Sequence, residues 1–355
     1  MKYQLYKKDR KEVVQVKEAE LNKLAKSKLK EFFEKRIELR IPNRFIEAWD
    51  EVALFHSKGD VEKANAILFP NEKSAFALNN GLNDLTAKEW LPETITVFSQ
   101  KGLGAGNKDA QIEKQHPAPF SFQDVGRLIQ FFSKENDKVL DPFSGVASTV
   151  KACAFTNRFG YGIELNPKYH NLGLQRIELE VPDNFPLKTK QNLINGNSQK
   201  EIKKFKKNEI DFIATSPPYW NILETVDHKG KERIDNDLDH KYSENDEDLA
   251  NIEDYDKFLS TLAKFFDDCS KPLKPGKYMC VIVSDFRKKE KYYTFHADLA
   301  NALEKKGYFV LKGIKILYQR HKSIYPYGYP FSFVPNMHHQ NVLIFQNIKK
   351  DDWDK

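Results

Sequence analysis

The sequence of 355 residues contains only three cysteines, Cys153, Cys269 and Cys280. They form no close pair and show no metal-ligand spacing, so a disulfide framework and a structural zinc site are not expected. No stretch approaches the roughly 20 apolar residues that a membrane span needs. Residues 1–15 carry charges where a secretory signal has an apolar run. We therefore expect a protein of the reducing cytoplasm with no membrane partner.

The small net positive charge of the chain can be traced to a single segment. The chain has 57 basic and 51 acidic residues, a net charge of +6. Residues 1–40 hold 13 Lys/Arg and 7 Asp/Glu, and this difference of six accounts for the whole excess. The segment is therefore the best candidate for phosphate contacts. A solvated helical face that binds nothing explains it equally well.

The order of the apolar segments predicts an α/β fold in two parts. Residues 1–110 are expected to form a mainly helical, basic segment, with helices over Val13–Leu39 and Arg44–Phe55. In residues 111–350, short apolar strands alternate with amphipathic helices. This pattern predicts a doubly wound, mostly parallel, seven-stranded Rossmann-like sheet. The last two strands follow each other without a helix, so one of them should pair antiparallel.

One segment of the second part departs from this alternation. Residues 221–256 hold 13 acidic and only 4 basic side chains, with few apolar ones. A loop of that length inside a compact domain is usually functional or disordered. We interpret it as an acidic loop insertion that serves as a lid or a spacer.

A strand, a tight turn and a helix start meet at Asp141–Gly145. Ligands of open α/β sheets bind beyond the carboxyl ends of the strands. Gly145 lets the backbone approach a ligand closely, and the amides at the start of the next helix suit an anionic group. Ser148 and Thr149 add hydroxyl donors there. The sequence lacks G-x-G-x-x-G, because Ala147 stands where a second glycine would fall, and this argues against a dinucleotide oxidoreductase.

Two later strand ends add polar groups. Glu164 follows Asp141 by 23 residues, and an acidic residue at this spacing accepts hydrogen bonds from ribose hydroxyls. The spacing suits any nucleoside-bearing cofactor. The next strand ends at Asn195-Gly196-Asn197-Ser198, where polar side chains have the chemistry to bond an adenine edge. A plain surface turn is the alternative interpretation of that tetrapeptide.

The most informative stretch is Ser216-Pro217-Pro218-Tyr219, which follows an apolar strand directly. Two prolines fix the backbone and remove two N–H donors. The Ser216 hydroxyl and the Pro217 carbonyl can then accept hydrogen bonds from a planar –NH2 group, and Tyr219 can stack on the base that bears it. Such acceptors favour a tetrahedral nitrogen whose lone pair points at an electrophilic methyl group. A stiff turn that merely closes a strand is the alternative.

Together these residues resemble the amino-group DNA methyltransferases, which act on cytosine N4 or adenine N6. The resemblance rests on Asp141–Gly145, Glu164 and Thr215–Trp220, and the combination is more specific than any one motif. His116–Ser121 resembles the conserved segment that precedes the cofactor turn in these enzymes. The resemblance covers roughly residues 110–350.

The resemblance implies S-adenosylmethionine as cofactor and double-stranded DNA as substrate, with the target base flipped out of the stack. It implies that Phe143, Gly145 and Thr149 hold the methionine part, that Glu164 holds the ribose and that Asn197 faces the adenine. In full, the implied cofactor-binding residues are Ala118, Phe120, Asp141, Pro142, Phe143, Gly145, Ser148, Thr149, Glu164 and Asn197, and the implied catalytic residues are Ser216, Pro217, Pro218 and Tyr219.

Serine at the first position of the catalytic turn is similar to the cytosine-N4 members, so cytosine N4 is the favoured target and adenine N6 the alternative. An RNA or protein amino-group methyltransferase is a second alternative. Cytosine C5 chemistry needs a cysteine nucleophile, and no cysteine here follows a proline. Intact Ser216–Tyr219 also argues against an inactive binding module. Adjacent histidines at positions 338 and 339 point to opposite faces of a strand, so no metal is expected.

Three departures from the family pattern matter. Ala147 replaces a frequent glycine, Asn197 replaces a frequent aspartate, and the cofactor motifs precede the catalytic motif. The DNA-reading segment stays open between residues 1–110, 221–256 and 319–339, the last with Tyr325, Tyr327, Tyr329 and His338. The resemblance implies a bacterial or phage-type cytoplasmic enzyme of the restriction–modification or solitary kind. A cognate restriction endonuclease, the recognition sequence and the oligomeric state stay open.

Overall fold

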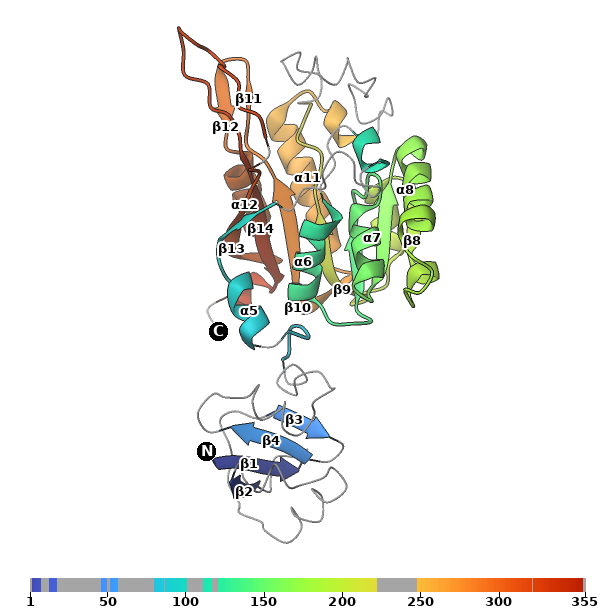
Figure 1. The fold of residues 1–355 in the computed structure, drawn as a ribbon. Helices are drawn as coiled ribbons and strands as arrows, with labels where there is room; N and C mark the ends of the chain where they lie inside the picture. The colour runs from blue at the N-terminus through green and yellow to red at the C-terminus, as the bar shows by residue number, and fades with distance from the viewer. Residues whose placement is uncertain are drawn as a thin grey trace. The chain divides into compact units, whose positions relative to one another are not determined.

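The chain divides into two compact units, Met1–Thr94 and Ile95–Lys355, both drawn in Figure 1. A computed structural model describes residues 2–7, 13–17, 46–49, 52–56, 80–85, 87–100, 111–116, 121–221, 248–320 and 322–353. Most of the acidic segment 221–256 and part of the expected cofactor segment, residues 117–120, lie outside the described residues. The division falls at Thr94/Ile95, whereas the sequence analysis places it near residue 110.

The first unit contains an antiparallel four-stranded sheet in the order β2-β1-β4-β3. The strands are β1 (Lys2–Lys7), β2 (Val13–Lys17), β3 (Ile46–Trp49) and β4 (Val52–His56), and the helix α5 (Ala87–Glu93) follows.

The helices expected over Val13–Leu39 and Arg44–Phe55 are therefore wrong wherever the structure describes those ranges. The described parts are rich in β-branched and aromatic residues, which favour strands. Leu5 of β1 pairs with Val14 of β2 and with Leu54 of β4. This pairing joins segments about 50 residues apart, which local periodicity does not report.

The second unit is built on an eight-stranded sheet in the order β5-β13-β14-β10-β9-β6-β7-β8. The strands β6 to β10 form parallel pairs, and β14 runs antiparallel to both of its neighbours. The strands are β5 (Val97–Ser99), β6 (Lys138–Asp141), β7 (Phe159–Glu164), β8 (Asn192–Asn195), β9 (Ile210–Thr215), β10 (Leu273–Val283), β13 (Phe309–Tyr318) and β14 (His339–Asn347).

The α/β class, the mostly parallel sheet and the antiparallel final strand are confirmed. The expected number of seven strands is corrected to eight, because β5 pairs with the edge strand β13. Residues 97–99 are too short a run for an apolar pattern to identify. Their place in the large sheet also explains why the unit begins before residue 110.

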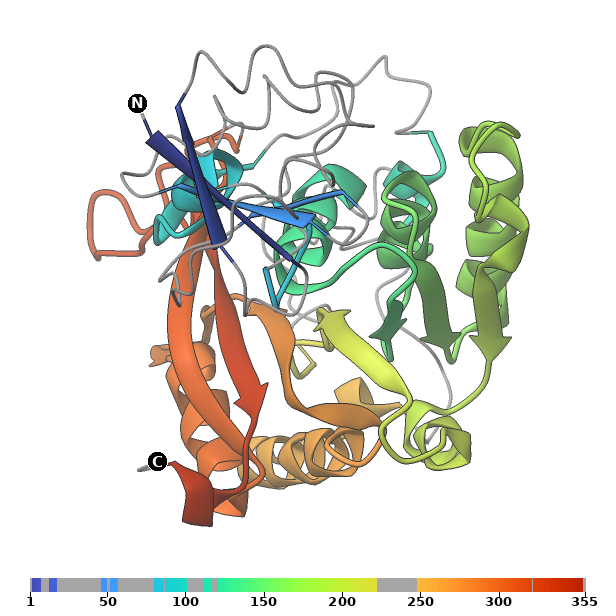
Figure 2. The same cartoon turned by 90° about the horizontal axis from the view of Figure 1, so that it is seen from below.

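Helices cover both faces of this sheet. They are α6 (Phe122–Phe132), α7 (Ser148–Phe155), α8 (Pro167–Glu180), α9 (Ser198–Glu201), α11 (Tyr255–Cys269) and α12 (Phe295–Lys306). In Figure 2, α6 and α7 lie on one face, whereas α11 and α12 lie on the other. Apart from the short α9, they follow the alternation of strands and helices that the sequence predicts. Side-chain caps begin α6, α8, α9 and α11: Ser121, for example, accepts a hydrogen bond from the Gln123 amide, 3.2 Å away.

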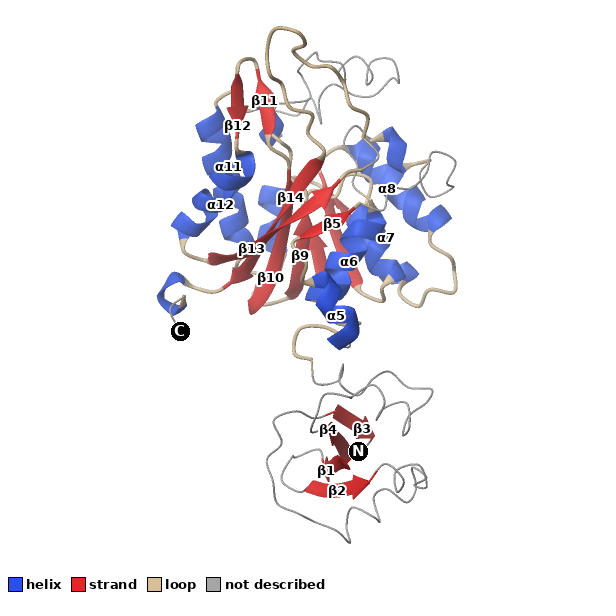
Figure 3. Cartoon of the chain, turned by 60° about the vertical axis from the view of Figure 1, so that its left-hand side comes forward, coloured by secondary structure: helices blue, strands red, loops and turns tan. Residues whose placement is uncertain are grey.

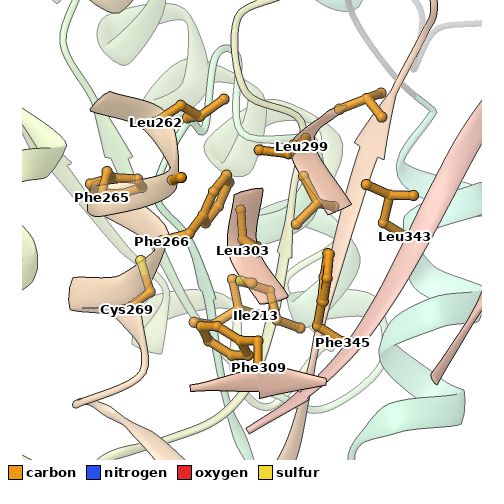
Figure 4. Packing of buried hydrophobic residues seen from close by; sticks show 14 of the residues in the cluster. Ile213, Leu262, Phe265, Phe266, Cys269, Leu299, Leu303, Phe309, Leu343 and Phe345 are labelled. Atoms are coloured by element: carbon orange, nitrogen blue, oxygen red, sulfur yellow. The ribbon is translucent and has the colours of Figure 1, made fainter. Parts of the chain in front are cut away.

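The main core lies between the sheet and the helices α11 and α12. Figure 4 shows its side chains, among them Leu262, Phe266, Leu303, Phe309 and Phe345, which are all at most 1% exposed. Each buried side chain of this size contributes roughly 1.5–3 kcal/mol. The core therefore fixes the positions of β9 and β10, whose carboxyl ends carry one half of the site.

The strand order reverses at β6. Its neighbours are β7 on one side and β9 on the other, which makes the carboxyl ends of β6 and β9 a topological switch point, the usual ligand site of such sheets. The two motifs found in the sequence follow these two strands. A small hairpin of β11 (Phe286–Lys288) and β12 (Lys291–Tyr293) follows β10 and is visible in Figure 3.

Candidate functional site

Asp141 joins the two sequence motifs. Its carboxylate is fully buried and accepts hydrogen bonds from the hydroxyls of Thr149 at 2.5 Å and Thr215 at 2.6 Å, and from the Phe143 amide at 3.1 Å. Burial raises its pKa to about 6, while these three hydrogen bonds oppose the rise. Because Thr215 immediately precedes Ser216, Asp141 fixes the turn after β6 against the turn after β9.

The turn after β6 uses two left-handed residues. Gly145 has φ +51° and Ala147 has φ +64°, ψ +34°, at the N-cap of α7. An alanine in this region is strained by roughly 1–2 kcal/mol, which explains why glycine is frequent at this position in the family that the sequence resembles. A Cβ on Gly145 would lie 3.1 Å from Nε2 of His116. The start of the His116–Ser121 segment therefore packs against the turn; Ala118 and Phe120, which the resemblance assigns to the cofactor, lie outside the described residues.

Glu164 presents a carboxylate beside this turn. Its Oε2 accepts the Gly145 amide at 2.7 Å, and its Oε1 accepts the Asn166 amide at 2.8 Å. Burial raises the pKa of Glu164 to about 7. The hydrogen bonds from the two amides lower this pKa, whereas the charges of Asp248 and Asp141 raise it further. The side chain is still partly exposed, and each oxygen has a further lone pair. The group is thus an acceptor for a pair of hydroxyls.

The end of β8 lies next to Glu164, since Asn195 is its register partner. Asn197 caps α9 by accepting the Gln199 amide at 2.8 Å, and the Ser198 hydroxyl donates to the carbonyl of Pro142. The sequence analysis places Asn197 at the adenine, and the structure places it at this edge as a helix cap.

Two further residues that the sequence analysis assigns to the cofactor, Ser148 and Phe143, have partners within the protein. Ser148 is buried and accepts a hydrogen bond at 2.8 Å from Arg176, whose guanidinium is itself fully buried. Phe143 packs on Phe265 and Phe266 of α11, with ring centroids 5.0 and 6.3 Å apart. These contacts fix the positions of Ser148 and Phe143 in the turn after β6.

The turn after β9, Ser216–Tyr219, which the sequence predicts to be the catalytic turn, is organised around the Ser216 hydroxyl. Its Oγ donates to the Ile282 carbonyl of β10 at 3.0 Å and lies 3.0 Å from the Tyr219 hydroxyl. The Tyr219 hydroxyl also accepts a hydrogen bond at 2.9 Å from Gln340, the second residue of β14. A hydroxyl has one proton and two lone pairs. When Ser216 gives its proton to Ile282, its lone pairs are left to accept hydrogen bonds. The Tyr219 hydroxyl has two acceptors in reach, Ser216 Oγ at 3.0 Å and the same Ile282 carbonyl at 3.3 Å.

Trp220 closes this turn with φ +54°, which is unusual for a bulky side chain. Its indole donates to the Ile252 carbonyl at 2.7 Å, and Nζ of Lys288 lies 3.7 Å from the ring centroid. The rings of Tyr255 and Tyr293 pack against it. Packing therefore holds a strained backbone next to the acceptor groups, as is common at functional sites.

Sequence reasoning missed four residues of this arrangement. Ile282 and Gln340 complete the hydrogen bonds of the catalytic turn, Lys288 covers Trp220, and Asp248 is a buried cap whose charge reaches Glu164. Their roles depend on which strands are neighbours and in which register, so no local motif marks them. Pro217 is buried and Pro218 partly exposed within the turn.

Other site chemistries find no support among the described residues. All three cysteines are buried, and burial raises the pKa of each thiol. Within the described part of the chain, no three metal-ligating side chains come together. Nor does any helix described there have the length and hydropathy to cross a bilayer.

The chain is similar in sequence to known DNA methylases. The model of a family described as DNA methylase (N6_N4_Mtase) matches residues 3–175 and 210–352. Putative methylase YubD of Escherichia coli strain K12 is 39% identical over 141 residues, which are 38% of this chain and 56% of that protein. Type II beta methyltransferase M.BslI of Bacillus sp. strain NEB-606 is 43% identical over 67 residues, 18% of this chain and 7% of that one.

The chain thus spans about half of the length of YubD and a much smaller share of M.BslI. Among solved structures, a SAM-dependent methyltransferase from Methanosarcina mazei aligns with a TM-score of 0.38 at 14% identity, over 61% of this chain and 94% of that one.

Proposed function

Since the chain belongs to the DNA methylase family, whose model covers most of its length, we propose that it transfers a methyl group from S-adenosylmethionine to the N4 amino group of cytosine in a specific sequence of double-stranded DNA. The observation that carries the proposal is the hydrogen-bonded Ser216 hydroxyl. Its proton is directed to Ile282 at 3.0 Å, so it faces a substrate as an acceptor.

An acceptor of this kind suits an exocyclic amine. The amine lone pair is delocalised into the ring, and hydrogen bonds from its N–H groups to Ser216 and to the Pro217 carbonyl favour a pyramidal nitrogen. Tyr219 holds Ser216 through its hydroxyl, while Gln340 holds Tyr219. The chain therefore contributes orientation, which is worth several kcal/mol when reacting atoms are held in line.

The turn beyond β6 fits S-adenosylmethionine. A pair of carboxylate oxygens on Glu164 matches the two ribose hydroxyls. The first amides of α7 suit the carboxylate of the methionine part. When bound there, the cofactor supplies an electrophilic methyl group on a sulfonium. Asp141 keeps this position in register with Ser216 through Thr215.

Serine at the first position of the catalytic turn supports cytosine N4 over adenine N6, since the chain resembles the cytosine-N4 members there. Type II methyltransferases among the relatives support a sequence-specific DNA substrate. A target amine inside duplex DNA must leave the base stack before it reaches this turn.

The test is methyl transfer from labelled S-adenosylmethionine to three substrates: duplex DNA made by amplification, total RNA and a mixture of unmodified proteins. Label on DNA, followed by mapping of the modified positions to one recurring sequence, supports the proposal. Label on RNA or on protein alone would overturn the DNA assignment and leave the cofactor site standing.

A further inference from the structure

The most exposed large apolar side chains of the described residues belong to one segment, residues 322–338, between β13 and β14. Phe331 and Phe333 are 94% and 89% exposed, and Tyr329 and Ile324 follow at 82% and 79%. Exposed apolar residues are ordinary when they are scattered, but a cluster of them marks a binding surface.

This segment is internally organised. Asn336 accepts the Tyr325 amide at 2.9 Å and donates to the Tyr325 carbonyl at 2.8 Å, which closes the loop below its tip. At the tip, the Gly328 carbonyl accepts the amides of Phe331 at 2.8 Å and Ser332 at 2.7 Å. The backbone is therefore shaped so that the two phenylalanines stand in solvent.

The segment is also tied to the catalytic turn. It leads directly into β14, and the second residue of that strand, Gln340, donates to the Tyr219 hydroxyl. Within it, Met337 lies 3.5 Å from the hydroxyl of Tyr292 in the β11–β12 hairpin, the hairpin whose Lys288 covers Trp220. Figures 1 and 3 show the hairpin and the loop rising together from the end of the sheet where β10 ends.

The charge of both elements suits an anionic partner. Residues 319–340 contain no acidic side chain and carry Arg320 and Lys322. The hairpin and its turn, residues 286–293, hold four basic side chains against the single acid Glu290. An apolar tip between basic flanks matches duplex DNA, whose phosphates surround an apolar stack of bases.

We propose that residues 322–338 form a wedge that enters the base stack of duplex DNA, with Phe331 and Phe333 filling the space left by the flipped target base. The proposal rests on the proposed function, because it is the flipped base that must reach Ser216. Unstacking and unpairing oppose flipping, and apolar side chains inserted between base steps offset part of that cost. The basic hairpin holds the neighbouring phosphates.

The test uses the full chain and an oligonucleotide duplex that carries the sequence mapped in the transfer experiment. The target base is either paired with its complement or placed opposite an abasic site, which makes flipping cheaper. Phe331→Ala/Phe333→Ala is compared with Leu179→Ala, which removes an exposed apolar side chain (75%) from α8, outside the segment. We expect the double variant to lose at least tenfold in methylation rate on the paired duplex and to regain wild-type rate on the abasic one.

Equal rates for the double variant and the wild type on the paired duplex would overturn the wedge. An equal loss on both duplexes would also overturn it, because it would assign the aromatic tip to binding or to folding. Loss of self-association in the double variant, with DNA rates unchanged, would assign the tip to a second copy of the chain. If the wild type methylates neither duplex, the proposed function itself has failed.

Discussion

In the proposed mechanism a single hydroxyl, that of Ser216, holds the reacting amine. It donates to Ile282, and it lies within hydrogen-bonding distance of the Tyr219 hydroxyl, which Gln340 holds in turn. The sequence alone allows Ser216 to be an ordinary turn residue after β9. Its contacts with Ile282 of β10, and with Gln340 of β14 through Tyr219, orient its hydroxyl as an acceptor.

Ser216→Ala is expected to lower kcat for DNA methylation roughly ten- to hundredfold, since one hydrogen bond to the reacting amine is worth about 1–3 kcal/mol. The affinity for S-adenosylmethionine should stay unchanged, because the residues predicted to hold the cofactor follow β6 and β7. Ser270→Ala, which removes a buried hydroxyl bonded to Asp267, is the matched control. Steady-state rates with saturating cofactor provide the measurement, and an unchanged kcat would remove Ser216 from the mechanism.

Glu164 makes folding stability depend on pH in a direction that can be checked. Its pKa is raised from 4.5 to about 7 in the folded chain. The folded state therefore binds the proton more tightly than the unfolded state. Its contribution to the free energy of unfolding is full below pH 4.5 and is lost as pH rises to about 7.

Glu164→Gln removes this dependence. Relative to wild type, the variant should gain roughly 1–3 kcal/mol of unfolding free energy between pH 5 and pH 8. The loss of one amide acceptor in the variant is the same at both values and cancels in the comparison. Urea unfolding at the two pH values measures the difference. A difference that does not change with pH would show that the carboxyl is not perturbed.

At the scale of elements, α7 and α8 meet through two small residues. A Cβ on Gly173 would lie 3.0 Å from Cβ of Ala147 and 3.3 Å from Cδ1 of Leu193. Gly173→Ala should therefore destabilise the chain by about 1–3 kcal/mol through overpacking. In an Ala147→Gly background the first of these contacts is gone, so the same substitution should cost less. Urea unfolding of the four chains gives the coupling energy, and strictly additive effects would contradict the contact.

The elements of the sheet could be predicted where local patterns and tertiary structure agree. β9, Ile210–Thr215, is a short buried strand with the apolar run Phe212–Ala214 at its centre, and α6 buries Val125, Leu128, Ile129 and Phe132 along one stripe. Both signals are local. By contrast, the short β5 shows its role only through pairing with β13, and the strands of residues 2–56 depend on contacts with partners distant in the sequence.

For the candidate site too, the sequence indicates the residues with local signals and misses those that depend on tertiary neighbours. Asp141, Gly145, Glu164 and Ser216 were found because strand ends carry recognisable turns. In the structure, Asp141 joins the two turns. Asn197 is a helix cap and Ser148 accepts a hydrogen bond from Arg176, and neither contact can be read from local sequence. The cofactor contacts themselves stay predictions.

At the scale of the whole molecule, the distribution of charge predicts how DNA is held. The sequence analysis looked for phosphate contacts in residues 1–40, whereas the described residues place a basic hairpin beside the catalytic turn. Lys289→Ala/Lys291→Ala should reduce the slope of log K against log salt by roughly one for each lysine. Lys305→Ala/Lys306→Ala, at the end of α12, should leave it unchanged. Fluorescence titration of a labelled duplex at several salt concentrations measures both, and equal slopes in all three proteins would remove the hairpin from the interface.

The most direct test of the account is the identity of the methylated base. DNA treated with the protein and S-adenosylmethionine is digested to nucleosides and analysed by mass spectrometry. The oriented acceptor at Ser216 predicts methylation of an exocyclic amine, and serine at this position, which resembles the cytosine-N4 members, predicts N4-methylcytosine. N6-methyladenine would keep the chemistry of the turn and correct the base that it holds, whereas 5-methylcytosine would contradict an amine-directed mechanism altogether.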